Sequence, residues 1–177
     1  MFKKIALIFI LVIAGVLLFA ATRPDTFRVE RSMTIDAAPE KIFPLVDDFR
    51  AWRQWSPWEN IDPNLKRIYS GAASGVGAAY AWEGNHQIGS GRMEILKAIP
   101  SSQIIIQLDF IKPFAARNTA EFNFKQKGAA TEVVWTMDGS NSYMHKVMGL
   151  FFNMDKMVGS SFETGLADLK TVAEQQP

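Results

Sequence analysis

The C-terminal third of the chain constrains the fold most. From Tyr143 to Glu174 the apolar residues recur three or four positions apart, which is the spacing of one face of an α-helix. A single amphipathic helix of this length would extend on the order of 45 Å, so it needs an equally long apolar surface, such as a curved sheet, to bury that face. The residues on the predicted face are Val147, Leu150, Phe151, Met154, Val158, Phe162, Leu166, Leu169 and Val172.

Glycine and methionine are frequent within this helical pattern. A glycine inside a helix costs about 1 kcal/mol relative to alanine, and methionine adapts its shape to irregular surroundings. Close approach of another backbone, or a helix that forms the wall of an adaptable cavity, would explain both. The residues concerned are Gly149, Gly159, Gly165, Met148, Met154 and Met157.

Alternating apolar and polar residues before the helix predict seven strands. In the first strand, Phe27, Val29, Met33 and Ile35 alternate with polar side chains. Short turns join the strands that follow, so an antiparallel sheet is expected. The six further strands are predicted at Leu65–Ser70, Ala78–Glu83, Gln87–Lys97, Gln103–Ile111, Thr119–Lys125 and Thr131–Met137.

Two short helices are predicted between the first and second strands. Pro39 and Glu40 suit the first turn of a helix. A second helix would begin near Asp47 or Asp48 and end at Trp55, because Ser56-Pro57 follows. The tryptophans of this region either pack the short helices onto the sheet, or they line the pocket mouth or lie at a bilayer surface. They are Trp52, Trp55 and Trp58.

This α+β order of elements resembles the helix-grip fold of the START-like (SRPBCC) superfamily, in particular its polyketide cyclase and dehydrase branch. The resemblance covers about residues 26–174 and implies a curved, seven-stranded antiparallel sheet wrapped around a long C-terminal helix. Members of that superfamily usually hold a hydrophobic ligand between the helix and the sheet, so a pocket is implied here. The segments that carry the resemblance are Ile35 through Phe43, Trp52 through Trp58, Gly91 through Ile95, Thr131 through Trp135 and Phe162 through Lys170.

The first 21 residues differ from the rest. Lys3 and Lys4 precede an apolar run at residues 5–21, which is longer than an ordinary signal-peptide core and at the short end of the membrane-spanning range. Cleavage at its end would leave a large side chain three positions upstream, so we expect a retained single-pass anchor, a linker at 22–25 and a domain at 26–174. With the lysines in the cytoplasm, the domain would lie outside the inner membrane. A cleaved signal, and hence a periplasmic or secreted protein, is the alternative.

Charge and composition exclude several kinds of function. There are 19 Lys and Arg against 18 Asp and Glu, which provides no basic surface for nucleic acid. The absence of cysteine removes thiolate metal sites and thiol catalysis, and two histidines leave little material for a metal cluster. We therefore expect no nucleic-acid partner, no metal and no cofactor, and leave a protein partner open.

Inward-facing side chains carry more aromatic volume than a flat sheet needs, so we expect them to close over a cavity. An apolar cavity would remove a hydrophobic or lipid-like molecule from water at about 25 cal/mol per Å² of apolar area. The candidate ligand-binding residues are Trp55, Trp58, Tyr80, Trp82, Met93, Leu108, Phe110, Phe122, Trp135, Phe151, Met154 and Val158.

Three functions stay open at the level of sequence. The favoured hypothesis is a membrane-anchored domain that binds a hydrophobic ligand without catalysis. The second is a cyclase or dehydrase that moves a proton with Glu83, His86 or Asp109. The third is an interaction module at the membrane whose core is filled by its own side chains. Arg92 with Asp109 or Glu94 could anchor a ligand head group, or could form outward-facing pairs on a wet sheet face.

Overall fold

The computed structural model describes residues 2–151 and 153–175, except for the side chain of Met154. The chain forms an α+β fold with one sheet, as expected from its sequence. The helices are α1 (Phe2–Ala21), α2 (Pro39–Asp47), α3 (Tyr143–Met148) and α4 (Met154–Gln175), with short 3₁₀ helices η1 (Ala51–Gln54) and η2 (Pro57–Asn60). The strands are β1 (Thr26–Ile35), β2 (Lys66–Gly71), β3 (Ala78–Glu83), β4 (Ser90–Ile99), β5 (Gln103–Lys112), β6 (Ala116–Lys127) and β7 (Ala130–Ser140).

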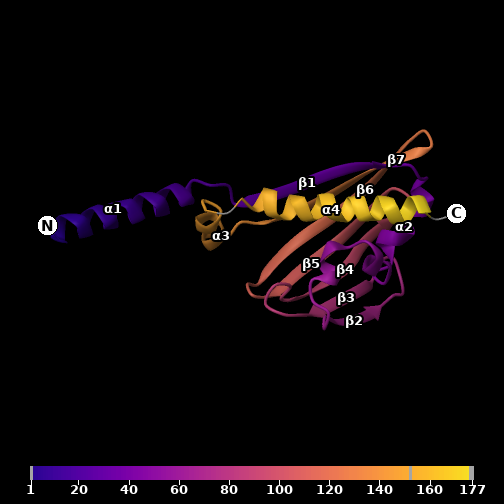
Figure 1. Ribbon diagram of the computed structural model, residues 1–177, viewed down its shortest axis with the longest axis horizontal. Helices are drawn as coiled ribbons and strands as arrows, with labels where there is room; N and C mark the ends of the chain where they lie inside the picture. Colours follow the sequence, from indigo (N-terminus) through magenta and orange to yellow (C-terminus); the bar gives the residue numbers. More distant parts are fainter. Residues whose placement is uncertain (1, 152, 176–177) are drawn as a thin grey trace.

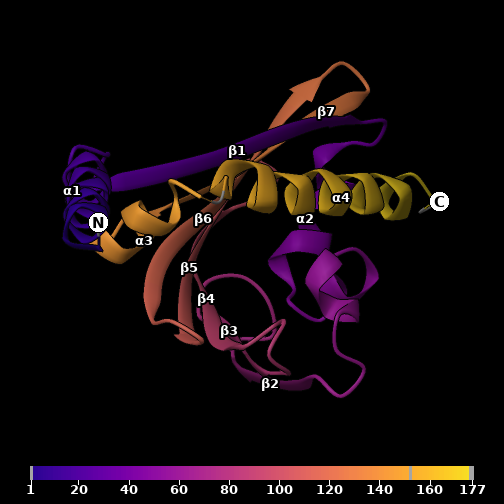
Figure 2. The same ribbon diagram turned by 60° about the vertical axis from the view of Figure 1, so that its left-hand side comes forward.

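The seven strands form one antiparallel sheet in the order β1-β7-β6-β5-β4-β3-β2. The sheet curves around α4, which lies along its concave side, while α2, η1 and η2 cover the end of that side near β2 and β3 (Figures 1 and 2). Alternation along the strands places one face inward, as in β6, where Ala120, Phe122 and Phe124 are buried. The predicted helix-grip arrangement is confirmed.

The prediction of one uninterrupted helix from Tyr143 to Glu174 was wrong. The helix breaks after Met148, and α4 begins at Met154. Gly149 closes α3 through a backbone hydrogen bond of 2.8 Å to the carbonyl of His145. The side chain of Asn153 then accepts a hydrogen bond of 2.9 Å from the N–H of Lys156, which caps the first turn of α4.

Helix α4 packs closely because two of its glycines lie against other elements. A Cβ atom at Gly159 would come within 2.0 Å of the Arg31 guanidinium, and one at Gly165 would be 3.0 Å from Trp135 and Pro57. The inward face of α4 is fully buried along most of its length. Its buried residues include Phe162, Leu166, Leu169 and Ala173.

The short helices are joined to one another by tryptophan side chains. The indole N–H of Trp52 donates to the carbonyl of Val46 at 2.9 Å, and that of Trp55 donates to the carbonyl of Leu45 at 2.8 Å. These bonds satisfy carbonyls in the last turn of α2, which have no partner within the helix. The predicted second helix is shorter than expected, since η1 spans Ala51–Gln54, and Pro57 starts η2.

Helix α1 projects from one end of the domain, beside α3 (Figures 1 and 2). Among the described residues it is the one helix long and apolar enough to cross a membrane, a judgement of length and composition alone. The Tyr143 hydroxyl donates to the carbonyl of Leu17 at 2.9 Å, and Lys146 pairs with Asp25. The end of α1 and the linker are therefore held against α3.

Candidate functional site

The centre of the domain is occupied by its own aromatic side chains. Trp135 lies between two rings: Phe162 stacks on it at 4.0 Å between centroids with planes 5° apart, and Phe122 at 4.7 Å. Trp55 and Trp58 meet Trp135 edge-on, each at 5.6 Å. We call these five residues the aromatic stack. It brings together four of the sequence-predicted ligand residues, and it lies between α4 and the sheet.

A second group of predicted residues lies toward β3, beyond the aromatic stack. Tyr80 and Met93 are buried, while Trp82, Leu108 and Phe110 are partly buried. The ring of Trp82 meets Phe110 edge-on at 5.9 Å, and its N–H donates to the carbonyl of Ile88 at 3.3 Å. These side chains also pack on one another.

The three predicted residues near the start of α4 are not brought into one pocket wall. Val158 is partly buried and packs against the core. Phe151 lies in the break between α3 and α4, where 70% of it is exposed. Its placement on the inward face depended on the continuous helix, which the structure does not have. Met154 begins α4, but its side chain lies outside the described part of the chain.

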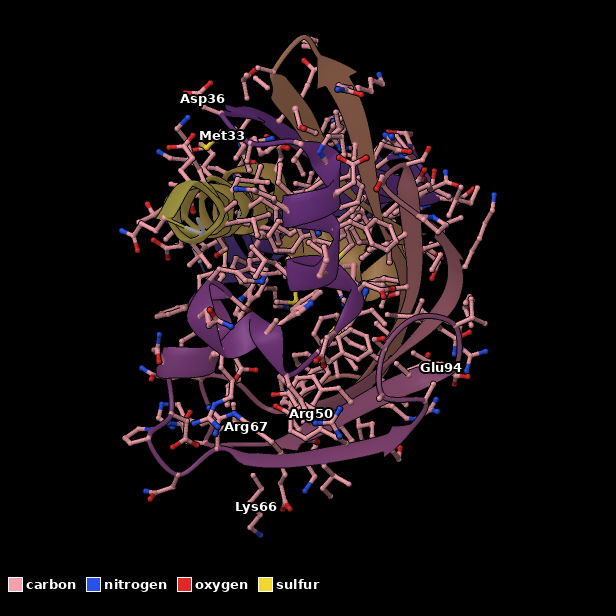
Figure 3. The ribbon with its side chains drawn as sticks, turned by 90° about the vertical axis from the view of Figure 1, so that its right-hand side faces the viewer. Met33, Asp36, Arg50, Lys66, Arg67 and Glu94 are labelled. Atoms are coloured by element: carbon pink, nitrogen blue, oxygen red, sulfur yellow. The ribbon has the colours of Figure 1, made fainter. Side chains whose placement is uncertain are left out.

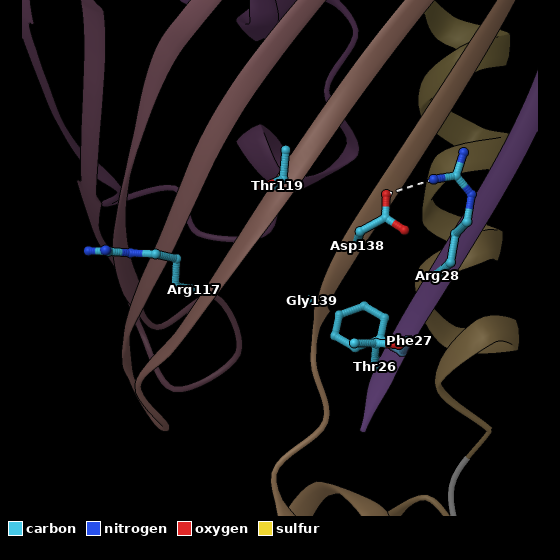
Figure 4. A pocket seen from close by; sticks show the side chains of 7 residues that line it. All are labelled: Thr26, Phe27, Arg28, Arg117, Thr119, Asp138 and Gly139. Atoms are coloured by element: carbon cyan, nitrogen blue, oxygen red, sulfur yellow. Dashed lines mark hydrogen bonds and ion pairs between the residues drawn. The ribbon is translucent and has the colours of Figure 1, made fainter. Parts of the chain in front are cut away.

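One hollow is an open groove of about 630 Å³ beside β1, β6 and β7. Figure 4 shows Arg28 and Asp138 facing each other across it, at 2.8 Å, with Arg117 and Thr119 on the neighbouring strand. Arg28 also pairs with Glu30, and Arg117 pairs with Asp109 at 2.7 Å. Because both cations already have carboxylate partners, this groove has little attraction for an anionic ligand.

Another hollow is a groove of about 310 Å³ between the β5–β6 loop and α3. We call it the α3 groove. Its size is at the low end of the range for small-molecule sites. One polar pair lies in it, since the Ser142 hydroxyl and His145 Nδ1 are 2.8 Å apart. Its other lining residues are largely apolar: Pro113, Phe114, Ala115, Met144 and Met148.

The proposed proton-transfer residues do not converge. Glu83 pairs with Lys66 at 3.3 Å, and His86 is exposed in the loop after β3. Partial burial would raise the pKa of Asp109, but hydrogen bonds from Arg117 and Gln107 outweigh it and hold that pKa below its usual range. An ionised, paired carboxylate is a poor general acid.

Arg92 and Glu94, which the sequence suggested as an anchor for a ligand head group, pair with each other on the surface of the sheet. Arg92 pairs with Glu94 at 2.6 Å, and Glu94 points away from the interior on the outer side of the sheet (Figure 3). Both residues alternate along β4 with Met93, which is buried. This is the outward-facing arrangement that the sequence left open.

Sequence reasoning missed one buried polar cluster. The Glu59 carboxylate is almost fully buried, accepts a hydrogen bond of 2.7 Å from the Tyr80 hydroxyl and pairs with Arg67 at 2.6 Å. Arg67 lies on β2, near η2 (Figure 3). Burial, followed by the bond to Glu59, raises the pKa of Tyr80 well above its ordinary value. No sequence signal marks Glu59, because its burial depends on η2 folding back over β2 and β3.

No group of three or more His, Cys, Asp or Glu side chains in the described part of the chain is placed to hold a metal ion.

Solved structures with the same fold are numerous. A protein from Chromobacterium violaceum has a TM-score of 0.61 at 13% identity, with 87% of this chain and 100% of that chain covered. The Aha1 dimer from Colwellia psychrerythraea has a TM-score of 0.56 at 21% identity, covering 84% of this chain and 97% of that one. The di-domain ARO/CYC protein BexL, from the BE-7585A biosynthetic pathway, has a TM-score of 0.63 at 14% identity, covering 90% of this chain and 54% of that one.

At such identities these likenesses concern the fold. A search of the curated proteins finds no match. Residues 26–174 do match the family model described as "Polyketide cyclase / dehydrase and lipid transport". This match spans nearly all of the chain that follows α1, and it agrees with the strand order, the curved sheet and the C-terminal helix. The chain therefore belongs to the polyketide cyclase/dehydrase and lipid transport family.

Proposed function

We propose that this protein is a membrane-tethered domain that binds a lipid-like or other hydrophobic small molecule in the α3 groove, without catalysing a reaction. The observation that carries the proposal is the position of this largely apolar groove, next to the helix that is apolar enough to span a membrane. The family description, which includes lipid transport, supports the ligand class.

The groove suits an apolar chain that carries one polar end. Phe114, Met144 and Met148 offer apolar surface, while Ser142 and His145 can exchange hydrogen bonds with a carboxyl or hydroxyl group. Methionine side chains accommodate ligands of varied shape. The sequence-based expectation placed the ligand in a central cavity between the helix and the sheet, so the α3 groove is a different site.

A titration of the full chain in detergent micelles with a fluorescent polyene fatty acid tests the proposal. We expect saturable binding of one molecule per chain. Met148→Arg should weaken it about tenfold or more, since one apolar side-chain contact contributes about 1.5 kcal/mol. Val76→Arg is the matched control, because Val76 is 60% exposed and lies in the turn between β2 and β3. Equal binding by both variants would count against the α3 groove.

A second candidate function is favoured by the aromatic stack itself. Trp135, Phe122 and Phe162 pack closely on one another, as in an ordinary protein core. An interaction module binds its partner at the surface, so it needs a stable core and no internal cavity. Absence of saturable binding in the wild-type chain would favour this alternative over the binding domain.

A further inference from the structure

Large apolar side chains are exposed together at the end of the domain from which α1 emerges. In α3, Tyr143 is 49% exposed, Met144 64% and Met148 39%. In and beside the β5–β6 loop, Ile111 and Phe114 are each 59% exposed. Soluble proteins seldom leave a group of such side chains in water without a partner.

The position of α3 is fixed relative to α1 and the linker. The Tyr143 hydroxyl bonds to the Leu17 carbonyl, and the buried ammonium of Lys146 pairs with Asp25. Asn141 adds two bonds to the linker, from its N–H to the Asp25 carbonyl at 2.7 Å and from its side chain to the Pro24 carbonyl at 3.2 Å. These contacts hold α3 against the end of α1 and the linker.

The depth of this contact follows from helix geometry. The apolar run at residues 5–21 extends about 26 Å as a helix, which is at the short end of the range that spans the hydrocarbon of a bilayer. Leu17 lies four residues before the last residue of α1, Ala21, so it is about 6 Å inside that end. A tyrosine that reaches this level lies where aromatic residues collect at membrane surfaces.

The polar groups nearby suit the same location. Lys146 is 8% exposed and pairs with Asp25, so the one lysine of α3 does not present a bare ammonium group to lipid. Arg23, just after α1, lies over the ring of Phe19 at 5.9 Å. At the end of a membrane-spanning helix, an arginine can keep its aliphatic stem among apolar groups while its guanidinium reaches lipid phosphates.

We propose that α3 lies in the head-group layer of the bilayer that α1 enters, so that the α3 groove opens toward lipid and takes its ligand from the membrane. This rests on the tether that belongs to the proposed function. It adds a second contact with the membrane, and it names the bilayer as the source of the ligand.

The chain has no cysteine, so single spin labels can be placed at chosen depths. We would label the full chain at Val12→Cys in α1, at Met144→Cys in α3 and at Lys127→Cys at the end of β6, in vesicles of phosphatidylcholine and phosphatidylglycerol. Collision with oxygen and with a water-soluble nickel complex then reports the depth of each label.

We expect the Val12 label to collide with oxygen, the Lys127 label with nickel, and the Met144 label to lie between them, with much less nickel contact than Lys127. A Met144 label as open to nickel as Lys127, while Val12 is protected, would overturn the inference and leave the tether intact. A Val12 label open to nickel would overturn both the tether and the inference. Neither result depends on whether the α3 groove binds a fatty acid.

Discussion

Removing one ring from the aromatic stack tests whether the centre of the domain is filled. Phe162 is 2% exposed, and its ring stacks at 4.0 Å on Trp135 and meets Trp58 edge-on at 6.2 Å. Truncating a buried phenylalanine to alanine costs about 3–5 kcal/mol, and ring pairs add about 0.5–1.5 kcal/mol beyond the area they bury. We therefore expect Phe162→Ala to lower the free energy of unfolding by about 4 kcal/mol.

The assay is urea unfolding of the full chain in micelles, followed by tryptophan fluorescence. Three of the five tryptophans, Trp55, Trp58 and Trp135, belong to the aromatic stack, so the signal reports the region that is changed. Phe114→Ala is the control, because Phe114 is 59% exposed and its loss should cost less than about 0.5 kcal/mol. Phe162→Leu, which should cost about 1–1.5 kcal/mol, serves if the alanine variant does not fold.

The variant should also acquire a property that the wild type lacks. An apolar cavity of this kind stays dry and binds benzene-sized molecules, so benzene should raise the stability of Phe162→Ala and leave the wild type unchanged. A loss below about 1.5 kcal/mol, with benzene stabilising both proteins, would mean that the centre already contains a void. That result would favour a ligand site between α4 and the sheet, as expected from the sequence.

Three further changes test other contacts. Trp55→Phe removes the donor to a carbonyl of α2, and thermal unfolding should show a loss of about 1–3 kcal/mol from the unpaired buried acceptor. Tyr80→Phe leaves the buried Glu59 carboxylate with one donor fewer, with a loss of similar size, about 1–3 kcal/mol, in the same measurement. The bond from Lys146 holds the pKa of Asp25 below its ordinary value, 3.8, so this link should persist above that value and be lost as pH falls through the depressed pKa. A spin label at Met144 should become more mobile over that acidic range, and constant mobility there would contradict the role of this pair.

The fold was largely predictable because its signals are local. Alternation of apolar and polar residues specified every strand, with boundaries that differ by at most a few residues. The break between α3 and α4 was not predictable in this way, because Leu150 and Phe151 continue the apolar spacing through it. It depends instead on the caps formed at Gly149 and by the Asn153 side chain, which periodicity does not report.

The candidate site was harder to predict, for a different reason. The sequence marked which aromatic residues face inward, but it could not tell whether they surround a void or pack on one another. Distances such as the 4.0 Å between Trp135 and Phe162 decide that, and they depend on the curvature of the sheet. The α3 groove was missed because Phe114 and Met148, far apart in sequence, meet at an exposed junction.

The sheet is open, and its β2 edge affects how copies of the protein behave beside one another. Molecules tethered to one membrane would meet in a shared orientation within a two-dimensional layer. The unpaired edge strands of neighbouring molecules could then form hydrogen bonds with one another. Strand β2 is short, and it carries Lys66 and Arg67 at its start. A short edge offers few backbone groups for pairing, and charged side chains along an edge strand are a common means of discouraging edge-to-edge association. The molecule can therefore be crowded on a surface without growing into a continuous sheet.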